Sequence, residues 1–148
     1  MLYINNNLKS SVVDISTDPC INYLSVSILL QPKISALISL IYRPPSTSRA
    51  LSLNALNNLK TLLSFPKFKF FILLGDFNAP NIDWSRHYSN KDSFDSDLLF
   101  FASTSSLTQH VRHSTRYRLG CSLSTLDLVF TNVPNSIMAL LFFAFFSL

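Results

Sequence analysis

Asp76 and Asn78 are the residues of this chain whose types and spacing are best suited to chemistry. They lie in Gly75–Pro80 (GDFNAP), directly after the apolar run Phe68–Leu74, which indicates a buried strand. In extended backbone successive side chains alternate, so the two polar groups would share one side while Phe77 packs on the other. The carboxylate can accept a proton or bind a metal ion, and the carboxamide can donate hydrogen bonds to an oxyanion.

A plain turn is the simpler interpretation of the same string, because Gly, Asp, Asn and Pro are the ordinary turn residues. Two other segments weigh against it. Tyr42 ends another apolar run, directly before Arg43 and two prolines, and Asp127 lies between apolar residues in Leu126–Phe130. An aspartate inside such a strand is costly to bury without a partner, and in hydrolases the usual partner is a histidine that it orients.

The segments that must position these residues indicate a mixture of strands and helices. The pattern predicts strands over Leu2–Ile4, Ser11–Ile15, Tyr23–Leu30, Ser35–Tyr42, Phe68–Leu74, Leu107–Val111 and Leu126–Thr131. It predicts one helix over Asn54–Leu63 and a second that is capped by Asp92 or Ser93, with Phe94, Leu98 and Phe101 on one face. This order favours an α+β or layered α/β sandwich over a helical bundle or an all-β barrel.

The composition indicates one folded domain. The chain has 148 residues, of which 48% are hydrophobic, and this content excludes disorder. A formal charge of +4 permits a polyanionic partner without requiring one. Arg112, His113, Arg116 and Arg118 lie close together, interleaved with Tyr117. This basic loop is either a strip that faces phosphates or an ordinary solvated loop, and both interpretations stay open.

The remaining composition indicates where the protein resides. Cys20 and Cys121 are far apart and lack metal-binding spacing, which suggests a reduced, intracellular protein. The first residues, MLYINNNLKS, lack the apolar core of a secretory signal. The apolar tail Ile137–Leu148 is shorter than the roughly 20 residues that span a bilayer. We therefore expect no membrane association, and no obligate protein partner is evident.

Four segments in a fixed order carry a family resemblance. They are Ile41–Pro45 (IYRPP), Leu74–Trp84 (LGDFNAPNIDW), Leu107–Gln109 with Thr115 and Arg116, and Ser124–Asn132 (STLDLVFTN). Together they resemble the endonuclease/exonuclease/phosphatase superfamily in the form carried by non-LTR retrotransposons. The resemblance covers residues 1–133 and leaves 134–148 as an apolar tail outside the pattern. It implies a four-layered α/β sandwich, here incomplete, of two sheets face to face with helices outside.

The resemblance also implies an activity, namely metal-dependent hydrolysis of phosphodiester bonds in DNA, usually with Mg²⁺ and with Mn²⁺ as the alternative. In that activity Asp76 would activate the attacking water, and Asn78 would hold the phosphate and that water, both of them at the metal. Tyr42 would contact the scissile phosphate, and Asp127 would orient a catalytic histidine.

Substrate binding and location follow from the same resemblance. It implies that Arg43 and Arg116 contact the DNA substrate. Because retroelement endonucleases of this type are associated with a reverse transcriptase and act on DNA, it also implies a nuclear location.

Two parts of the family pattern are missing. All eight acidic residues are aspartates, so the family's metal-binding glutamate is absent, and no Ser-Asp-His string follows Asn132. His110 and His113 precede the Asp127 strand, at the wrong point of the chain order to replace that histidine. Because members of a catalytic set act as a unit, we expect little or no activity. The alternatives are a non-catalytic remnant that at most binds nucleic acid through its basic loop, and hydrolysis of phosphoinositide or sphingomyelin head groups.

Overall fold

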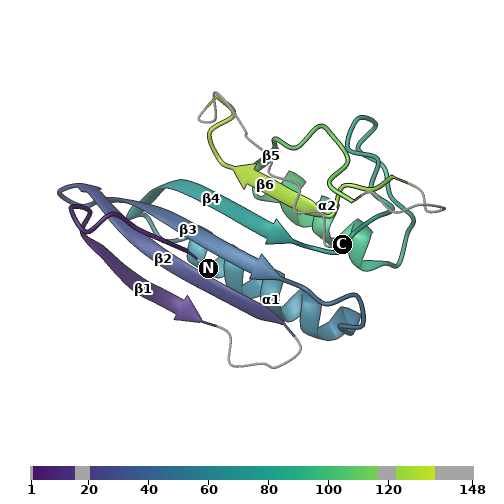
Figure 1. Cartoon of the computed structure of the whole chain (residues 1–148), viewed down its shortest axis with the longest axis horizontal. Coiled ribbons are helices and arrows are strands. Elements are labelled where there is room, and N and C mark those ends of the chain that lie inside the picture. The colour runs from purple at the N-terminus through teal and green to yellow at the C-terminus, as the bar shows by residue number, and fades with distance from the viewer. Residues whose placement is uncertain (1, 16–20, 117–122, 136–148) are drawn as a thin grey trace, which may run out of the picture.

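The computed structural model describes residues 2–15, 21–116 and 123–135. Both cysteines, Arg118 and most of the apolar tail lie outside these ranges. The described residues form β1 (Ser10–Ile15), β2 (Asn22–Gln31), β3 (Ile34–Tyr42), α1 (Arg49–Leu63), β4 (Phe68–Asp76), α2 (Phe94–Thr104), β5 (Thr108–Gln109) and β6 (Asp127–Thr131). The strands make one sheet in the order β1-β2-β3-β4-β6-β5 (Figure 1).

The pairing directions bring distant segments to one end of this sheet. β1, β2 and β3 pair antiparallel in sequence, whereas β3 and β4 are parallel neighbours. A parallel pair needs a crossover connection, and α1 supplies it. β6 then pairs antiparallel with β4, so the start of β6 lies beside the ends of β3 and β4.

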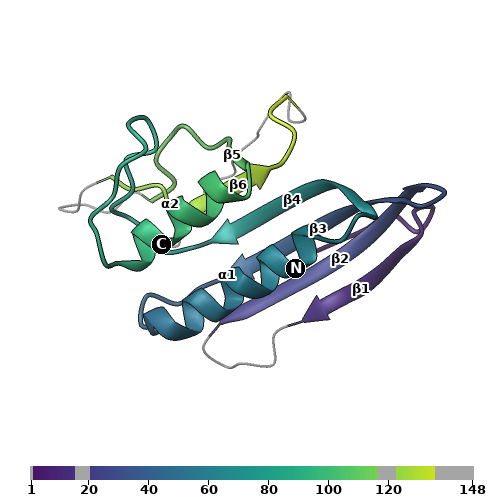
Figure 2. The same ribbon diagram turned by 180° about the vertical axis from the view of Figure 1, so that it is seen from behind.

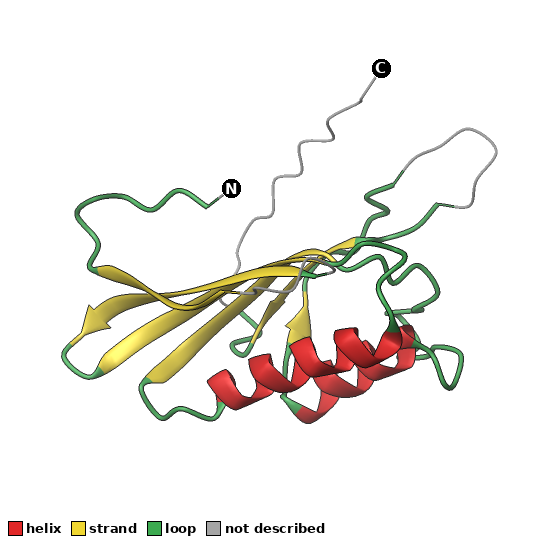
Figure 3. Ribbon diagram, turned by 90° about the horizontal axis from the view of Figure 1, so that it is seen from below, coloured by secondary structure: helices red, strands yellow, loops and turns green. Residues whose placement is uncertain are grey.

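Both helices cover the same face of the sheet (Figures 2 and 3). The core lies between these two layers because alternate strand residues point toward the helices. Leu37 of β3, Leu73 of β4 and Phe130 of β6 are fully buried there, together with Leu59 of α1 and Leu98 of α2. The mixed α/β class is therefore confirmed, and the described residues supply one sheet and one helical layer of the expected sandwich.

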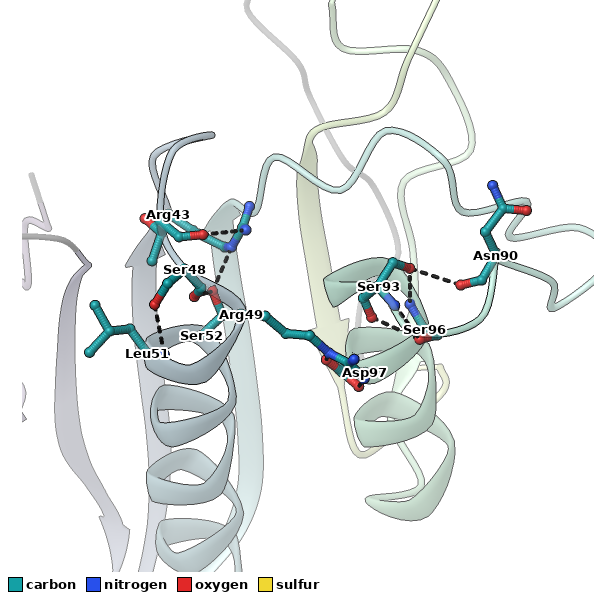
Figure 4. A network of polar contacts seen from close by, with 10 residues as sticks. Arg43, Ser48, Arg49, Leu51, Ser52, Asn90, Ser93, Ser96 and Asp97 are labelled. Carbon is teal, nitrogen blue, oxygen red and sulfur yellow. Dashed lines mark hydrogen bonds and ion pairs between the residues drawn. The ribbon is translucent and has the colours of Figure 1, made fainter.

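The two helices begin at serines that cap them (Figure 4). Ser48 accepts a hydrogen bond from the backbone of Leu51, and α1 accordingly starts five residues before the predicted Asn54. Of the two caps predicted for α2, the structure has Ser93, which forms a reciprocal capping box with Ser96. Each cap satisfies backbone N–H groups that a helix cannot satisfy internally.

The predicted strands are largely confirmed. Two differ from the prediction: Leu2–Ile4 forms no strand, and the expected Leu107–Val111 strand narrows to β5. The reason for the second difference is local, since the backbone N–H of Leu107 donates to Ala102 and so closes the end of α2. Among the described helices, none is long and apolar enough to cross a membrane.

Candidate active site

Tyr42, Asp76 and Asp127 lie in one row across three neighbouring strands. Tyr42 is the register partner of Asp76 in the β3–β4 pair, and Asp76 is the register partner of Asp127 in the β4–β6 pair. Directly opposed residues point to the same face of a sheet, here the face opposite the helices. The structure therefore brings together three positions that are remote in the sequence.

Gly75 allows the strands to approach closely beside this row. Its register partner is Ile41, and a Cβ atom built on Gly75 would lie 1.8 Å from the carbonyl oxygen of Ile41. The φ angle of Gly75 is +147°, which side chains rarely adopt. Any other residue at this position would push β4 away from β3, next to the Tyr42–Asp76 pair.

The turn after β4 is built by Asp76 and Asn78 themselves. The backbone N–H of Asn78 donates to Asp76 Oδ1 at 3.0 Å, and Asn78 has a φ of 46°. The expectation that extended backbone continues to Asn78 is therefore wrong, because the strand ends at Asp76 and a left-handed turn follows. Phe77 is buried on the opposite side as predicted, with its ring centroid 5.6 Å from that of Phe130.

Burial raises the pKa of the Asp76 carboxyl above its usual range, because a half-buried carboxylate is poorly solvated. The neighbouring Asp127 carboxylate raises this pKa further, while hydrogen bonds from Asn78 and the charge of Arg116 lower it. The net upward shift favours a carboxyl group that can take up a proton, as a general base must.

This upward shift predicts that Asp76→Asn unfolds at a higher temperature than the wild type at pH 7. A pKa that is higher in the folded state means that ionising Asp76 costs folding free energy. The protonated Asp76 carboxyl therefore contributes its full stability below the unfolded pKa. This contribution is lost as the pH rises through the folded pKa. Thermal unfolding at a series of pH values should show the advantage of the variant shrinking as pH falls toward 4.

Asp83→Asn is the matched control for this pH series, because its expected effect has the opposite sign. The hydroxyl of Ser85 and the backbone N–H groups of Ser85 and Arg86 donate to Asp83, and they lower its pKa. Asp83→Asn should therefore not gain stability at neutral pH. A loss of stability in Asp76→Asn at pH 7 would contradict the proposed cost of the Asp76 charge.

Asp127 differs from its predicted environment. It is the first residue of β6 and is exposed, so the argument that a buried carboxylate here needs a histidine partner is wrong. Thr115 Oγ1 accepts hydrogen bonds from the backbone N–H groups of Leu126 and Asp127, and these bonds fix the start of β6. His110 instead bonds to Thr131 at the other end of β6, at 2.7 Å. Thr131 lies four positions along β6 from Asp127, a distance of about 13 Å.

Arg116 and Arg43 occupy different positions relative to the row. Arg116 borders a cleft of about 420 Å³ that Asn78 and the start of α2 also line, and its charge acts on Asp76. Arg43 borders the same cleft but is buried, and its N–H groups donate to Ser52 and to protein carbonyls. The guanidinium of Arg43 is thus engaged within the protein, whereas among the described residues no such contacts hold Arg116 away from the cleft, and the predicted substrate contacts of both residues stay predictions.

Comparison with protein families decides the relationship. The family described as "Endonuclease-reverse transcriptase" matches residues 36–143. The chain belongs to this family. No curated protein matches the chain in sequence.

Two solved structures can be compared with this chain. The endonuclease domain of TRAS1, a telomere-specific non-LTR retrotransposon, is 19% identical with a TM-score of 0.59, over 85% of this chain and 54% of that chain. D. rerio TDP2 complexed with a single-strand DNA product is 11% identical with a TM-score of 0.49, over 88% and 54%. The chain thus spans about half the length of these structures, and the likeness to TRAS1 shows the fold.

The endonuclease-reverse transcriptase family implies a divalent metal, and the residues at the row fit one only in part. Asp76 and Asp127 offer hard carboxylate oxygens and Asn78 an amide oxygen, which are groups that Mg²⁺ accepts while keeping several waters. The mutual repulsion of the two carboxylates would be relieved by a cation between them. However, the described residues hold no group of three or more His, Cys, Asp or Glu side chains around one point. Asp76, Asp127 and Asn78 are therefore suited to weak binding of a divalent cation.

Three supporting residues of this family member were not identified from the sequence as parts of the site. Thr115 fixes β6, Gly75 permits the close approach of β3 and β4, and Phe94 packs its ring against the Arg43 guanidinium. A glycine that directly follows an apolar run could have indicated a close backbone approach. Thr115 lay in a segment of the family resemblance but was given no role of its own, and no local pattern marked Phe94 as part of the site, because both act through contacts between distant segments.

Proposed function

We propose that this chain carries the incomplete active site of a metal-dependent phosphodiesterase that acts on DNA. The site consists of the row of Tyr42, Asp76 and Asp127, with Asn78 beside it. The observation that carries this proposal is the register, which sets a phenol and two carboxylates side by side on one sheet face. Membership of the endonuclease-reverse transcriptase family supports the reaction class. The DNA substrate also makes a nuclear location the natural expectation.

Each residue has a role that its chemistry allows. Asp76, with its raised pKa, takes the proton of the attacking water, and the Asn78 carboxamide orients that water and the phosphate. The Tyr42 side chain is about half exposed and can donate its phenol to a phosphate oxygen. When bound by Asp76 and Asn78, Mg²⁺ would neutralise phosphate charge. Arg116 supplies a further positive charge at the cleft.

The expected rate is very low, because the set lacks the family's glutamate and histidine. Supercoiled plasmid incubated with the full chain and Mg²⁺ should be nicked little or not at all above an Asp76→Ala control. Chelation of the metal should abolish any remaining nicking activity. Strong nicking that needs Mg²⁺ and disappears in Asp76→Ala would contradict the expected low activity. Strong nicking that persists in Asp76→Ala would refute the assigned site.

A second function, binding of nucleic acid without cleavage, is favoured by the exposure of the basic loop. Arg112 and His113 are exposed, and Arg116 is half-buried at the cleft. If these groups contact phosphates, the affinity for DNA should fall steeply with salt, and Arg112→Ala should reduce the salt slope by about one. Lys60→Ala on the exposed side of α1 should leave the slope unchanged. Binding that is insensitive to salt would rule this function out.

A further inference from the structure

Arg43 lies beneath the turn that carries Asn78, although arginine is usually a surface residue. Only 7% of it is exposed. Its backbone N–H donates to the carbonyl oxygen of Asp76 at 2.9 Å, and its own carbonyl oxygen accepts a hydrogen bond from Asn78 Nδ2 at 2.8 Å. The main chain of Arg43 therefore contacts the residues on both sides of Phe77.

The guanidinium group of Arg43 contacts both this turn and the start of α1, and Figure 4 shows its contact with Ser52. Nε donates to Ser52 Oγ at 2.8 Å, and Nη2 donates to the carbonyl oxygen of Thr47 at 3.1 Å. Nη1 lies 3.3 Å from the carbonyl oxygen of Asn78 and 3.5 Å from that of Phe77. A planar group with five donors can serve all these acceptors at once, which the compact ammonium group of lysine cannot do.

The second helix completes the surroundings of this cation. The Phe94 ring centroid lies 4.0 Å from the Arg43 Cζ atom, a favourable cation–π contact. Burial lowers the pKa of Arg43 and the charge of Asp95 raises it, but an arginine remains charged at any physiological pH. Because a buried cation is costly to leave unpaired, the carbonyl groups around it are held in place.

Asn78 has a φ of 46°, a left-handed conformation that asparagine adopts more readily than most residues but that still costs free energy. Conformations of this kind persist only where the surrounding structure fixes them. The carbonyl oxygen of Asn78 accepts from the Arg43 guanidinium, and the side-chain amide of Asn78 donates to the main-chain carbonyl of Arg43. Arg43 thus restrains both the main-chain carbonyl and the side-chain amide of Asn78.

We propose that Arg43 is a positioning residue, which holds Asn78 in the left-handed turn that presents its carboxamide beside Asp76. The proposal rests on the proposed function for its catalytic meaning. Its geometric content concerns the free protein and can be tested without DNA or metal.

The test follows the side-chain amide of Asn78 in the full chain by ¹⁵N–¹H NMR at neutral pH. In Arg43→Lys this signal should move toward that of a free asparagine. Its exchange with solvent should become about tenfold faster, because losing the guanidinium contacts to the turn should release Asn78 and so weaken the bond from its Nδ2 to the main-chain carbonyl of residue 43 by about the strength of an ordinary hydrogen bond. Ser52→Ala is the matched control: it removes an acceptor of the same guanidinium at α1, away from the turn, and should leave the Asn78 signal in place.

An unchanged Asn78 amide in a folded Arg43→Lys variant would overturn the proposal. An equal change in Ser52→Ala would do so as well, since it would indicate a general loosening. If Arg43→Lys fails to fold, Phe94→Leu replaces it, because this change removes the ring against the guanidinium and keeps an apolar side chain in the core. A smaller shift of the same signal is expected there, and no shift contradicts the proposal. Absence of DNA cleavage by the wild type leaves the NMR result untouched, so the two proposals can fail separately.

Discussion

Gly75→Ala is expected to destabilise the protein more than any other of the proposed substitutions. The added Cβ would lie 1.8 Å from the Ile41 carbonyl oxygen, and the φ of +147° disfavours any side chain. Because the obstacle is backbone in the centre of the sheet, relief requires β3 and β4 to separate. We expect a loss of about 4 kcal/mol or more, at the extreme of single substitutions. In thermal unfolding this corresponds to a fall of roughly 10 °C or more.

Lys69→Ala in the same strand is the control for this prediction. Lys69 is exposed, and its replacement should change the free energy of unfolding by no more than about 0.5 kcal/mol. A Gly75→Ala variant that unfolds within a few degrees of the wild type would show that β3 and β4 do not approach as closely as the register requires.

Phe130→Ala is expected to have the second-largest effect. The side chain is fully buried, and its ring centroid lies 5.6 Å from that of Phe77 and 5.5 Å from that of Trp84, both edge-on. Removing a buried phenylalanine costs about 3–5 kcal/mol, a large share of the total stability of a typical domain. Denaturant unfolding measures the loss, and the near-ultraviolet circular dichroism of Trp84 should weaken in parallel.

Phe100→Ala separates this packing effect from the mere loss of an aromatic ring. Phe100 lies on α2 and is 68% exposed, so its removal should cost about 0.5 kcal/mol or less. Similar losses in the two variants would contradict the central place of Phe130. A large loss in Phe130→Ala alone would tie the Asp76–Asn78 turn to the core, because Phe77 packs on the same ring.

The main elements of this fold could be predicted from the sequence because apolar runs and punctuating residues mark them. The prolines that follow Arg43 and the turn residues between Gly75 and Pro80 mark where β3 and β4 end, and those ends carry the polar row. The sequence placed the start of α1 too late because Arg49 and Ala50 belong to no apolar repeat. Only the cap at Ser48 marks where the helix begins.

The candidate site was predictable in its positions but less so in its environments. Their places in or after apolar runs singled out Tyr42, Asp76 and Asp127, the family resemblance gave them roles, and the register sets them side by side. Whether Asp127 is buried depends on where β6 begins, which sequence patterns locate poorly. The burial of Arg43 depends on acceptors contributed by three distant segments, and no local pattern encodes such a set.

The pairing of β4 with β6 has a consequence during synthesis. A nascent polypeptide leaves the ribosome with its N-terminus first, so β3, α1 and β4 can associate before β6 has been made. Until then one edge of β4 lacks a partner and is open to wrong pairing. A translation product that stops before Asp127 would therefore keep an exposed strand edge, and it would never bring the two carboxylates together.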